Sequence, residues 1–186
     1  LFIVLLPVSA ALLCMLFSRM QKNLGSWIVI GSIAAAFMSA VTVLQQVIAD
    51  GGKPIHYWMG NWQPPLGIEF VIDPISGVLA VLITFISLLG SLYSLPFVKE
   101  EGWLHIGGYY TLYGLMTVGM CGMVITGDVF NLYVFLEVMS LSGYGLIALG
   151  GKKSMLAAFR YLLIGTIGAS LYLLGVGYMY ALTGTL

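Results

Sequence analysis

A single carboxylate, Glu137, lies inside a long apolar stretch of the sequence. From Val129 to Leu149 almost every residue is apolar or small, and Glu137 is near the middle. A charged side chain at the centre of a bilayer costs roughly 2.5–3.5 kcal/mol on insertion scales. The acid escapes this cost if it stays protonated, since desolvation favours its neutral form, or if a cation pairs with it. The chemistry that this position supports is reversible proton binding.

Hydroxyl groups follow the same side of the expected helix. At 100° per residue, Tyr133, Glu137, Ser140 and Tyr144 fall within roughly 60° of one another. Tyrosine and serine hydroxyls can donate to a carboxylate or hold water beside it. Because ionisable groups within membrane spans are functional by default, we predict that Glu137 translocates protons along a polar path through these residues. The alternative is a buried acid that only fixes helix packing.

The chain offers few cations that could pair with this acid. Lys152 and Lys153 lie roughly 22 Å further along a continued helix, at the expected membrane surface. Arg160 enters the last apolar run by about one turn, so we expect water rather than direct contact to join it to Glu137. We predict that Arg160 belongs to the polar path. The sequence therefore predicts that the partner of Glu137 is missing from this chain or lies on a helix that would follow Leu186.

Composition places these residues in a membrane. Charged residues make up 8% of the 186 residues and hydrophobic residues 60%, whereas soluble domains carry roughly 25% charged residues. The formal net charge is zero, which gives no reason to expect a nucleic-acid partner. Cys14 and Cys121 both fall within apolar runs and are expected to be core residues. We predict no metal site, no cofactor site and no enzyme activity of this chain itself.

Six runs are long and apolar enough, or nearly so, to span a bilayer as helices, and period-two alternation, which would indicate a β-barrel, is absent. The predicted fold is therefore an all-α polytopic membrane protein, with residues 1–186 forming a single transmembrane domain. The six runs are Leu1–Phe17, Trp27–Ile48, Ile75–Phe97, Leu104–Thr126, Val129–Leu149 and Leu156–Leu182.

One connection is long enough to fold on its own. Residues 50–73 contain Gly and Pro pairs that punctuate two short segments rich in aromatic or β-branched residues, which predicts an external β-hairpin. His56, within it, is expected to be a polar loop residue rather than a metal ligand. Asp73 before Pro74, and Asp128 before the fifth run, are typical of helix N-caps.

The basic residues predict a direction of insertion. Six of them fall in or near alternate connections, and the other connections hold only Lys53. We expect these basic loops to be cytoplasmic and the N-terminus to lie outside, in a cell inner or plasma membrane. The six are Arg19, Lys22, Lys99, Lys152, Lys153 and Arg160.

Small residues recur at helical spacing in two of the runs. Gly119 and Gly122 do so in the fourth run, and Gly165, Gly168 and Gly175 in the sixth. Small residues let helix backbones approach closely in lipid, so close packing is the expected role of these glycines.

Three segments of the sequence resemble a known family. "TGDVFNLYVFLEVMSLSGYGLIALGG", followed by "AAFRYLLIGTIGASLYLLGVGYMYALTGTL", resembles the antiporter-like membrane subunits shared by Mrp-type multisubunit cation/proton antiporters and respiratory complex I. Within this family, the blocks resemble in particular the D-type subunit of the Mrp antiporters. "GIEFVIDPISGVLAVL", residues 67–82, resembles the segment leading into that family's third helix.

The resemblance implies a larger fold than this chain holds. The family forms a bundle of about fourteen helices with two inverted repeats, the first beginning at the fourth helix. By this resemblance the chain is the N-terminal portion of such a subunit. Residues 1–97 then hold the first three helices with the external loop 50–73, and residues 98–186 begin the first inverted repeat.

The resemblance also assigns a role to Glu137. It matches the family's fifth-helix glutamate, which pairs with a lysine on the seventh helix and gates proton movement along a hydrated polar axis. No seventh helix is present in this sequence, in keeping with the missing partner. Arg160 occupies the position that the family usually gives to a lysine early in the sixth helix.

The function expected from these observations is a membrane subunit of a multisubunit monovalent cation (Na⁺)/H⁺ antiporter. Its partners would be other membrane subunits, protons, Na⁺ and lipid. The alternative is a proton-pumping antiporter-like subunit of a complex I-like NADH-quinone oxidoreductase or a membrane-bound hydrogenase. A third reading, a passive scaffold in a membrane assembly, predicts tolerance of Glu137→Ala.

Overall fold

The chain folds into six helices and one small hairpin in a computed structural model that describes residues 1–20, 24–62, 67–98 and 103–185. Five of the described helices are long and apolar enough to cross a membrane, and Phe2–Ser18 is a shorter apolar helix. The helices are α1 (Phe2–Met20), α2 (Leu24–Ala49), α3 (Pro74–Val98), α4 (Trp103–Ile125), α5 (Val129–Ala148) and α6 (Lys152–Thr183).

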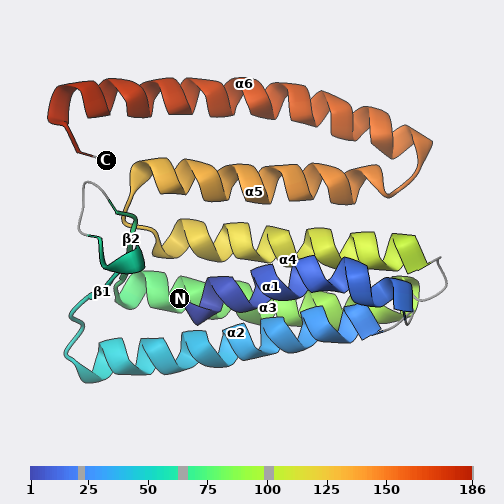
Figure 1. Cartoon of the computed structure of the whole chain (residues 1–186), viewed down its shortest axis with the longest axis horizontal. Helices are drawn as coiled ribbons and strands as arrows, with labels where there is room; N and C mark the ends of the chain where they lie inside the picture. Colours follow the sequence, from blue (N-terminus) through green and yellow to red (C-terminus); the bar gives the residue numbers. More distant parts are fainter. Residues whose placement is uncertain (21–23, 63–66, 99–102, 186) are drawn as a thin grey trace.

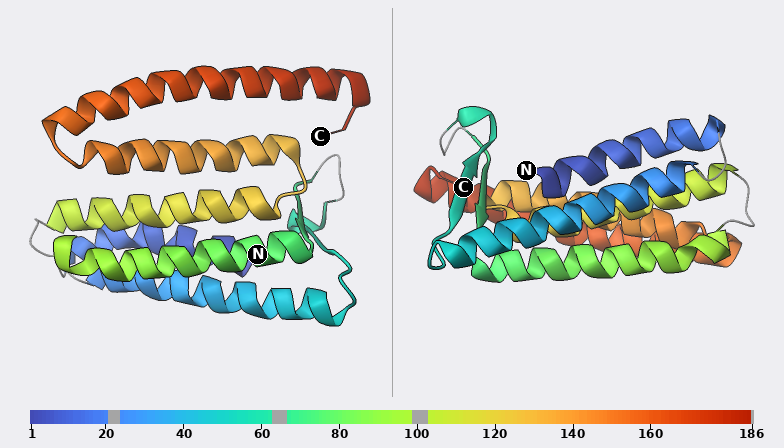
Figure 2. Two further views of the ribbon diagram at one scale, coloured as in Figure 1. Left: turned by 180° about the vertical axis from the view of Figure 1, so that it is seen from behind. Right: turned by 90° about the horizontal axis from the view of Figure 1, so that it is seen from below.

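The helices run up and down, with successive helices antiparallel (Figure 1). Helices α1 to α4 form a closed group in which α1 contacts both α2 and α4, and α3 contacts both α2 and α4. Helix α5 packs on α4, and α6 packs on α5, so these two helices extend the group as a row. The view from behind shows the same row (Figure 2, left). Consequently α6 forms one edge of the described structure.

The sixth helix begins earlier than hydropathy predicts. It starts at Lys152 rather than Leu156, so Lys152 and Lys153 form its first turn instead of a loop. Hydropathy marks where the apolar surface begins, whereas the backbone hydrogen bonds continue beyond it. Long lysine side chains can extend to water from such a turn. Arg160 therefore lies about two turns into the helix.

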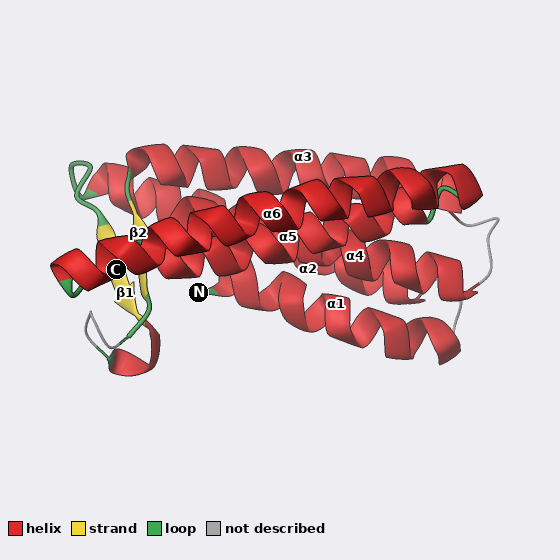
Figure 3. Cartoon of the chain, turned by 90° about the horizontal axis from the view of Figure 1, so that it is seen from above, coloured by secondary structure: helices red, strands yellow, loops and turns green. Residues whose placement is uncertain are grey.

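The hairpin lies across one end of the bundle (Figure 3). Strands β1 (Ile55–Trp58) and β2 (Glu69–Ile72) pair antiparallel, with Ile55 opposite Ile72 and Trp58 opposite Glu69. The short 3-10 helix η1 (Met59–Asn61) follows β1. The predicted hairpin is thus confirmed. We call the end of the bundle where it lies the hairpin end, and the opposite end, where α6 begins with Lys152, the basic end.

The hairpin closes the core of the four-helix group. Phe70 of β2 is buried and its ring lies 6.2 Å from that of Phe135 on α5. The Gly127 N–H donates to the Glu69 carbonyl oxygen at 2.9 Å, so β2 is attached directly to the turn before α5. Cys121 is buried in the same cluster, and Cys14 in a second cluster nearer the basic end, as expected.

Predicted helix caps and close helix contacts are present as well. The Ser76 N–H donates to Asp73 Oδ1 at 2.6 Å, and Pro74 is the first residue of α3. On α4, a Cβ at Gly119 would lie 2.6 Å from the backbone nitrogen of Met139, and Gly122 lies against the ring of Phe135. These two glycines therefore let α4 and α5 approach closely.

The sixth helix uses its glycines differently from the expectation. Gly165 contacts α5, but a Cβ at Gly168 or Gly175 would meet no atom of the described residues within 4 Å. Of these three glycines of α6, close packing against the described residues is therefore confirmed for Gly165 alone. The reason is geometric, since α6 contacts α5 along one side only.

Candidate proton site

Helix α5, which carries Glu137, begins at a firmly capped end. Asp128 Oδ1 accepts from the backbone N–H groups of Phe130 at 2.7 Å and Asn131 at 3.0 Å. The predicted N-cap is therefore confirmed. Two otherwise unpaired N–H groups of the first turn are satisfied by one carboxylate, which fixes where the helix starts.

One side of α5 is used for packing against α4. Phe135 and Met139 fill the space above Gly122 and Gly119. Asn131 and Ser142, which periodicity places away from Glu137, are buried, and the Asn131 amide donates to Thr126 Oγ1 at 2.9 Å. The helix is thus held to α4 by residues that leave the predicted polar face free for another contact.

The predicted polar face turns towards α6. The ring of Tyr133 stacks on that of Tyr172, with centroids 6.3 Å apart and planes 9° from parallel. The rings of Tyr144 and Tyr161 are nearly perpendicular, with centroids 5.1 Å apart. The Tyr144 hydroxyl lies against Gly165. The two outer members of the face therefore both contact α6, about three turns apart.

Glu137 lies between these two contacts and is partly buried. The Tyr133 phenol, one turn away on the same side of α5, is close enough to interact electrostatically with the Glu137 carboxylate. Among the described residues, the single ion pair joins His56 and Glu69 on the hairpin, at 2.8 Å, so no cation there pairs with Glu137. The acid therefore has a potential hydrogen-bond donor beside it but no counter-charge from this part of the chain.

The other predicted path residues divide into two groups. Tyr144 and Ser140 are partly buried on the same face as Glu137. Arg160 is exposed, and no described contact joins it to α5. Arg160 is the residue before Tyr161, which contacts Tyr144 of α5. Adjacent residues point about 100° apart around a helix, so Arg160 does not share that contact. The structure therefore brings together three predicted hydroxyl residues and the acid, but not the arginine.

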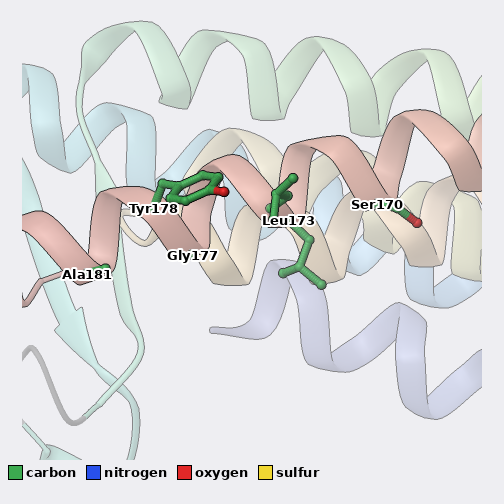
Figure 4. A pocket seen from close by; sticks show the side chains of 6 residues that line it. Ser170, Leu173, Gly177, Tyr178 and Ala181 are labelled. Carbon is green, nitrogen blue, oxygen red and sulfur yellow. The ribbon is translucent and has the colours of Figure 1, made fainter.

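Several surface depressions lie along α6, and two of them differ in their relation to the polar face. The first, about 380 Å³, opens between α5 and α6 towards the basic end, next to Tyr144. Its other lining residues are Leu141, Gly145, Ala148, Met155, Ala158, Phe159 and Leu162. The second, about 580 Å³, is a groove formed by α6 alone around Ser170, Leu173 and Tyr178 (Figure 4). Of these two cavities, the first shares a residue with the polar face and the second does not.

Within the described residues, no three His, Cys, Asp or Glu side chains gather as metal ligands do. His56, expected to be a solvated loop residue, instead shares Glu69 with Trp58, whose indole N–H donates to the same carboxylate oxygen at 2.9 Å. The candidate site is therefore the carboxylate–phenol group on α5 and α6.

Comparison of the chain with known proteins finds similar sequences along nearly its whole length. Residues 126–186, which include α5 and α6, match the family described as "NADH:quinone oxidoreductase/Mrp antiporter, TM". The chain is 43% identical over 184 residues to the N-type subunit of NADH-quinone oxidoreductase from Desulforudis audaxviator. It is 33% identical over 187 residues to the D-type subunit of a Na⁺/H⁺ antiporter from Bacillus subtilis. Along nearly its whole length, the chain is therefore homologous to antiporter-like membrane subunits of these two kinds.

The antiporter-like chain covers only part of its relatives. The alignments include 99% and 98% of this chain but 36% and 37% of the two relatives. In the structure of the membrane-bound sulfane sulfur reductase, an archaeal respiratory membrane complex, a chain matches with a TM-score of 0.90 at 31% identity. That match covers 99% of this chain and 37% of the other. Helices and family together make the protein a multi-pass membrane protein.

Two residues of this antiporter-like site were not predicted. Tyr161 and Tyr172 supply the α6 side of both contacts with the polar face. A signal for them was present, since residues eleven apart lie about three turns apart on the same side of a helix. Tyr133 and Tyr144 show the same spacing on α5, so two matched pairs could have been read from the sequence.

Proposed function

We propose that this chain forms part of a proton path in an antiporter-like subunit, with Glu137 as the residue that binds and releases the proton. The observation that carries the proposal is the position of Glu137. It lies on an apolar helix, partly buried, beside Tyr133, with no counter-charge from the described residues. A carboxylic acid in such surroundings is stable when neutral and unstable when ionised and unpaired.

The proton cycle follows from these two states. Without a nearby cation, desolvation favours the neutral acid, and Glu137 takes up a proton. When a basic group approaches, the carboxylate is stabilised, and the O–H bond breaks to release the proton. The cation supplied by the rest of the assembly therefore controls loading, while Tyr133 offers a hydroxyl donor to the ionised form.

The energy coupling we favour is exchange of protons for Na⁺ in a multisubunit antiporter of the plasma membrane, with the basic end in the cytoplasm. The similarity to the D-type subunit of a Na⁺/H⁺ antiporter over nearly the whole chain supports this choice. Partners would then be the other membrane subunits of the antiporter, protons and Na⁺. The chain itself would transport rather than catalyse a chemical reaction.

A second function is favoured by a separate observation. Identity is higher to a NADH-quinone oxidoreductase subunit, at 43%, and the fold matches a chain of a respiratory membrane complex with a TM-score of 0.90. On this reading the same Glu137 cycle would be driven by electron transfer in attached subunits. The cation exchanged for the proton would then be absent or secondary.

The decisive experiment replaces the carboxyl group and keeps its shape. In everted vesicles that carry the assembled complex, we expect Glu137→Gln to lower Na⁺-dependent collapse of the pH gradient about 100-fold, as loss of a proton-transfer group does. Asp50→Asn is the matched control, because it removes an exposed carboxylate at the hairpin end and should leave transport unchanged. Retained transport in an assembled Glu137→Gln complex would refute the proposal.

The same vesicles separate the two couplings. Proton uptake that responds to added Na⁺ without an electron donor supports antiport. Proton uptake that requires an electron donor and ignores Na⁺ supports the redox-driven reading. Co-purification of the complex with each variant shows whether assembly is intact.

A further inference from the structure

Tyr172, on the edge helix α6, contacts α5 at two residues about one turn apart, Val129 and Tyr133. Its ring lies nearly parallel to that of Tyr133, at 9° and 6.3 Å. Its hydroxyl donates to the carbonyl oxygen of Val129 at 3.2 Å. Tyr172 is also close enough to interact electrostatically with the capping residue Asp128. One side chain therefore ties α6 to the start of α5 and holds the ring that lies next to Glu137.

The surroundings of Tyr172 set it apart from its neighbours on α6. Leu171 and Leu173 are 65% and 37% exposed, whereas Tyr172 is partly buried against α5. A tyrosine with a bonded hydroxyl and a stacked ring loses most of its rotational freedom. Tyr133 is one face of that stack, so the place of its phenol depends on Tyr172 as well as on its own helix.

We propose that Tyr172 is a positioning residue for the Glu137 proton site, because it holds the Tyr133 phenol beside the carboxylate. This inference rests on the proposed function of Glu137. The Tyr133 hydroxyl can donate to the ionised carboxylate but gives less to the neutral acid, so a fixed phenol favours release of the proton. Tyr172 thereby sets the pH at which the site loads, without touching the proton itself.

The other titratable groups on this side of α5 are few within the described residues. Tyr133 and Ser140 are the hydroxyl donors within about one turn of Glu137 on this face, and the charged groups lie towards the two ends of the helices. Besides Glu137, the titratable groups of α5 and α6 are Tyr133, Tyr144, Tyr161, Tyr172, Tyr178 and Tyr180, with Asp128 at the hairpin end and Lys152, Lys153 and Arg160 towards the basic end. Helix α4, which packs on the other side of α5, carries His105, Tyr109, Tyr110, Tyr113 and Cys121.

The test measures protonation of Glu137 directly. Dicyclohexylcarbodiimide reacts with protonated carboxyl groups in apolar surroundings, and mass spectrometry of the purified complex gives the fraction of Glu137 modified at each pH. We expect Tyr133→Phe to raise the midpoint of this curve by about one pH unit, a tenfold change in proton affinity. Tyr172→Leu should raise it in the same direction by about half as much.

A double variant shows whether Tyr172 acts through Tyr133. If it does, Tyr133→Phe with Tyr172→Leu shifts the midpoint no further than Tyr133→Phe alone, since residues that share one contact are not additive. Tyr172→Phe keeps the stack and loses the bond to Val129, and should give an intermediate shift in a complex that still assembles. Tyr178→Leu, on the exposed part of the same helix, is the control and should give none.

Two results would overturn the inference. One is an unchanged midpoint in Tyr172→Leu while Tyr133→Phe shifts it, and the other is a double variant whose shift is the sum of the two. Its failure is distinguishable from that of the proposed function. If these midpoints move as expected but Glu137→Gln retains full transport, Tyr172 positions the acid while the acid is not the transport residue.

Discussion

Gly127 and Glu69 join two parts of the protein that the chain order keeps far apart. The backbone N–H of Gly127, in the turn before α5, donates to the carbonyl oxygen of Glu69 on β2 at 2.9 Å. An isolated bridge between Phe70 and Thr126 continues the contact. The hairpin is therefore attached to the start of the helix that carries Glu137, and a disturbance of the hairpin is expected to reach α5.

Gly127 is the residue to enlarge for a test of this attachment. A Cβ there would lie 2.7 Å from Val71 Cγ2, so in Gly127→Ala either the Val71 side chain or strand β2 must shift. We expect a loss of about 1–3 kcal/mol of stability, as overpacking gives. Thermal melting of the purified complex measures it. Gly143→Ala, within α5, meets no atom within 4 Å and is the control; an equal effect of both changes would contradict the prediction.

The hairpin is predicted to loosen in acid. Hydrogen bonds from His56 and Trp58 hold the pKa of Glu69 below its ordinary value. A lowered pKa contributes stability that is complete above the unfolded-state pKa of about 4.3 and is lost as the pH falls through the folded pKa. Tryptophan fluorescence from about pH 6 to about pH 3 should report this step through the Trp58 indole.

Glu69→Gln provides the check on that acid transition. The amide oxygen can still accept from Trp58, but no proton-linked step remains. We therefore expect the fluorescence change assigned to Trp58 to disappear in Glu69→Gln and in Trp58→Phe. An identical acid transition in Glu69→Gln would show that another group causes it.

Close approach of α4 and α5 gives a third prediction. A Cβ at Gly119 would lie 2.6 Å from a backbone nitrogen, which cannot move aside as a flexible side chain can. Gly119→Ala should therefore cost about 1–3 kcal/mol. Gly108→Ala, on the same helix, meets nothing within 4 Å and should be neutral or stabilising by up to about 1 kcal/mol. Thermal melting of both variants decides, and a destabilised Gly108→Ala would count against this packing.

The cap of α5 gives a fourth prediction. Asp128→Ala leaves the N–H groups of Phe130 and Asn131 without their acceptor and should cost about 1 kcal/mol. Asp128→Asn keeps a side-chain oxygen and should cost much less. Hydrogen exchange of the first turn of α5 is the measurement, with faster exchange expected in the alanine variant only. Equal exchange in all three proteins would mean that the cap is unimportant.

Local signals in the sequence were sufficient for the helices and their caps. Apolar runs predict helices because every backbone polar group in a bilayer must be satisfied within the span. The caps at Asp73 and Asp128 depend on residues close in sequence and were confirmed. The start of α6 was predicted too late in the sequence. An apolar run does not show how many residues before Leu156 are already in the helix, which begins at Lys152.

The sequence by itself determined that this is a membrane protein of helices with one acid, Glu137, and three hydroxyl residues on one face, because helical period and apolar content are local properties. Only the tertiary structure decided what that face meets. It placed Tyr172 on Tyr133 and Tyr161 on Tyr144, left Arg160 exposed, and attached Glu69 to Gly127. These contacts depend on how α6 and the hairpin pack against α5, and packing between distant segments is not written in the period of either one.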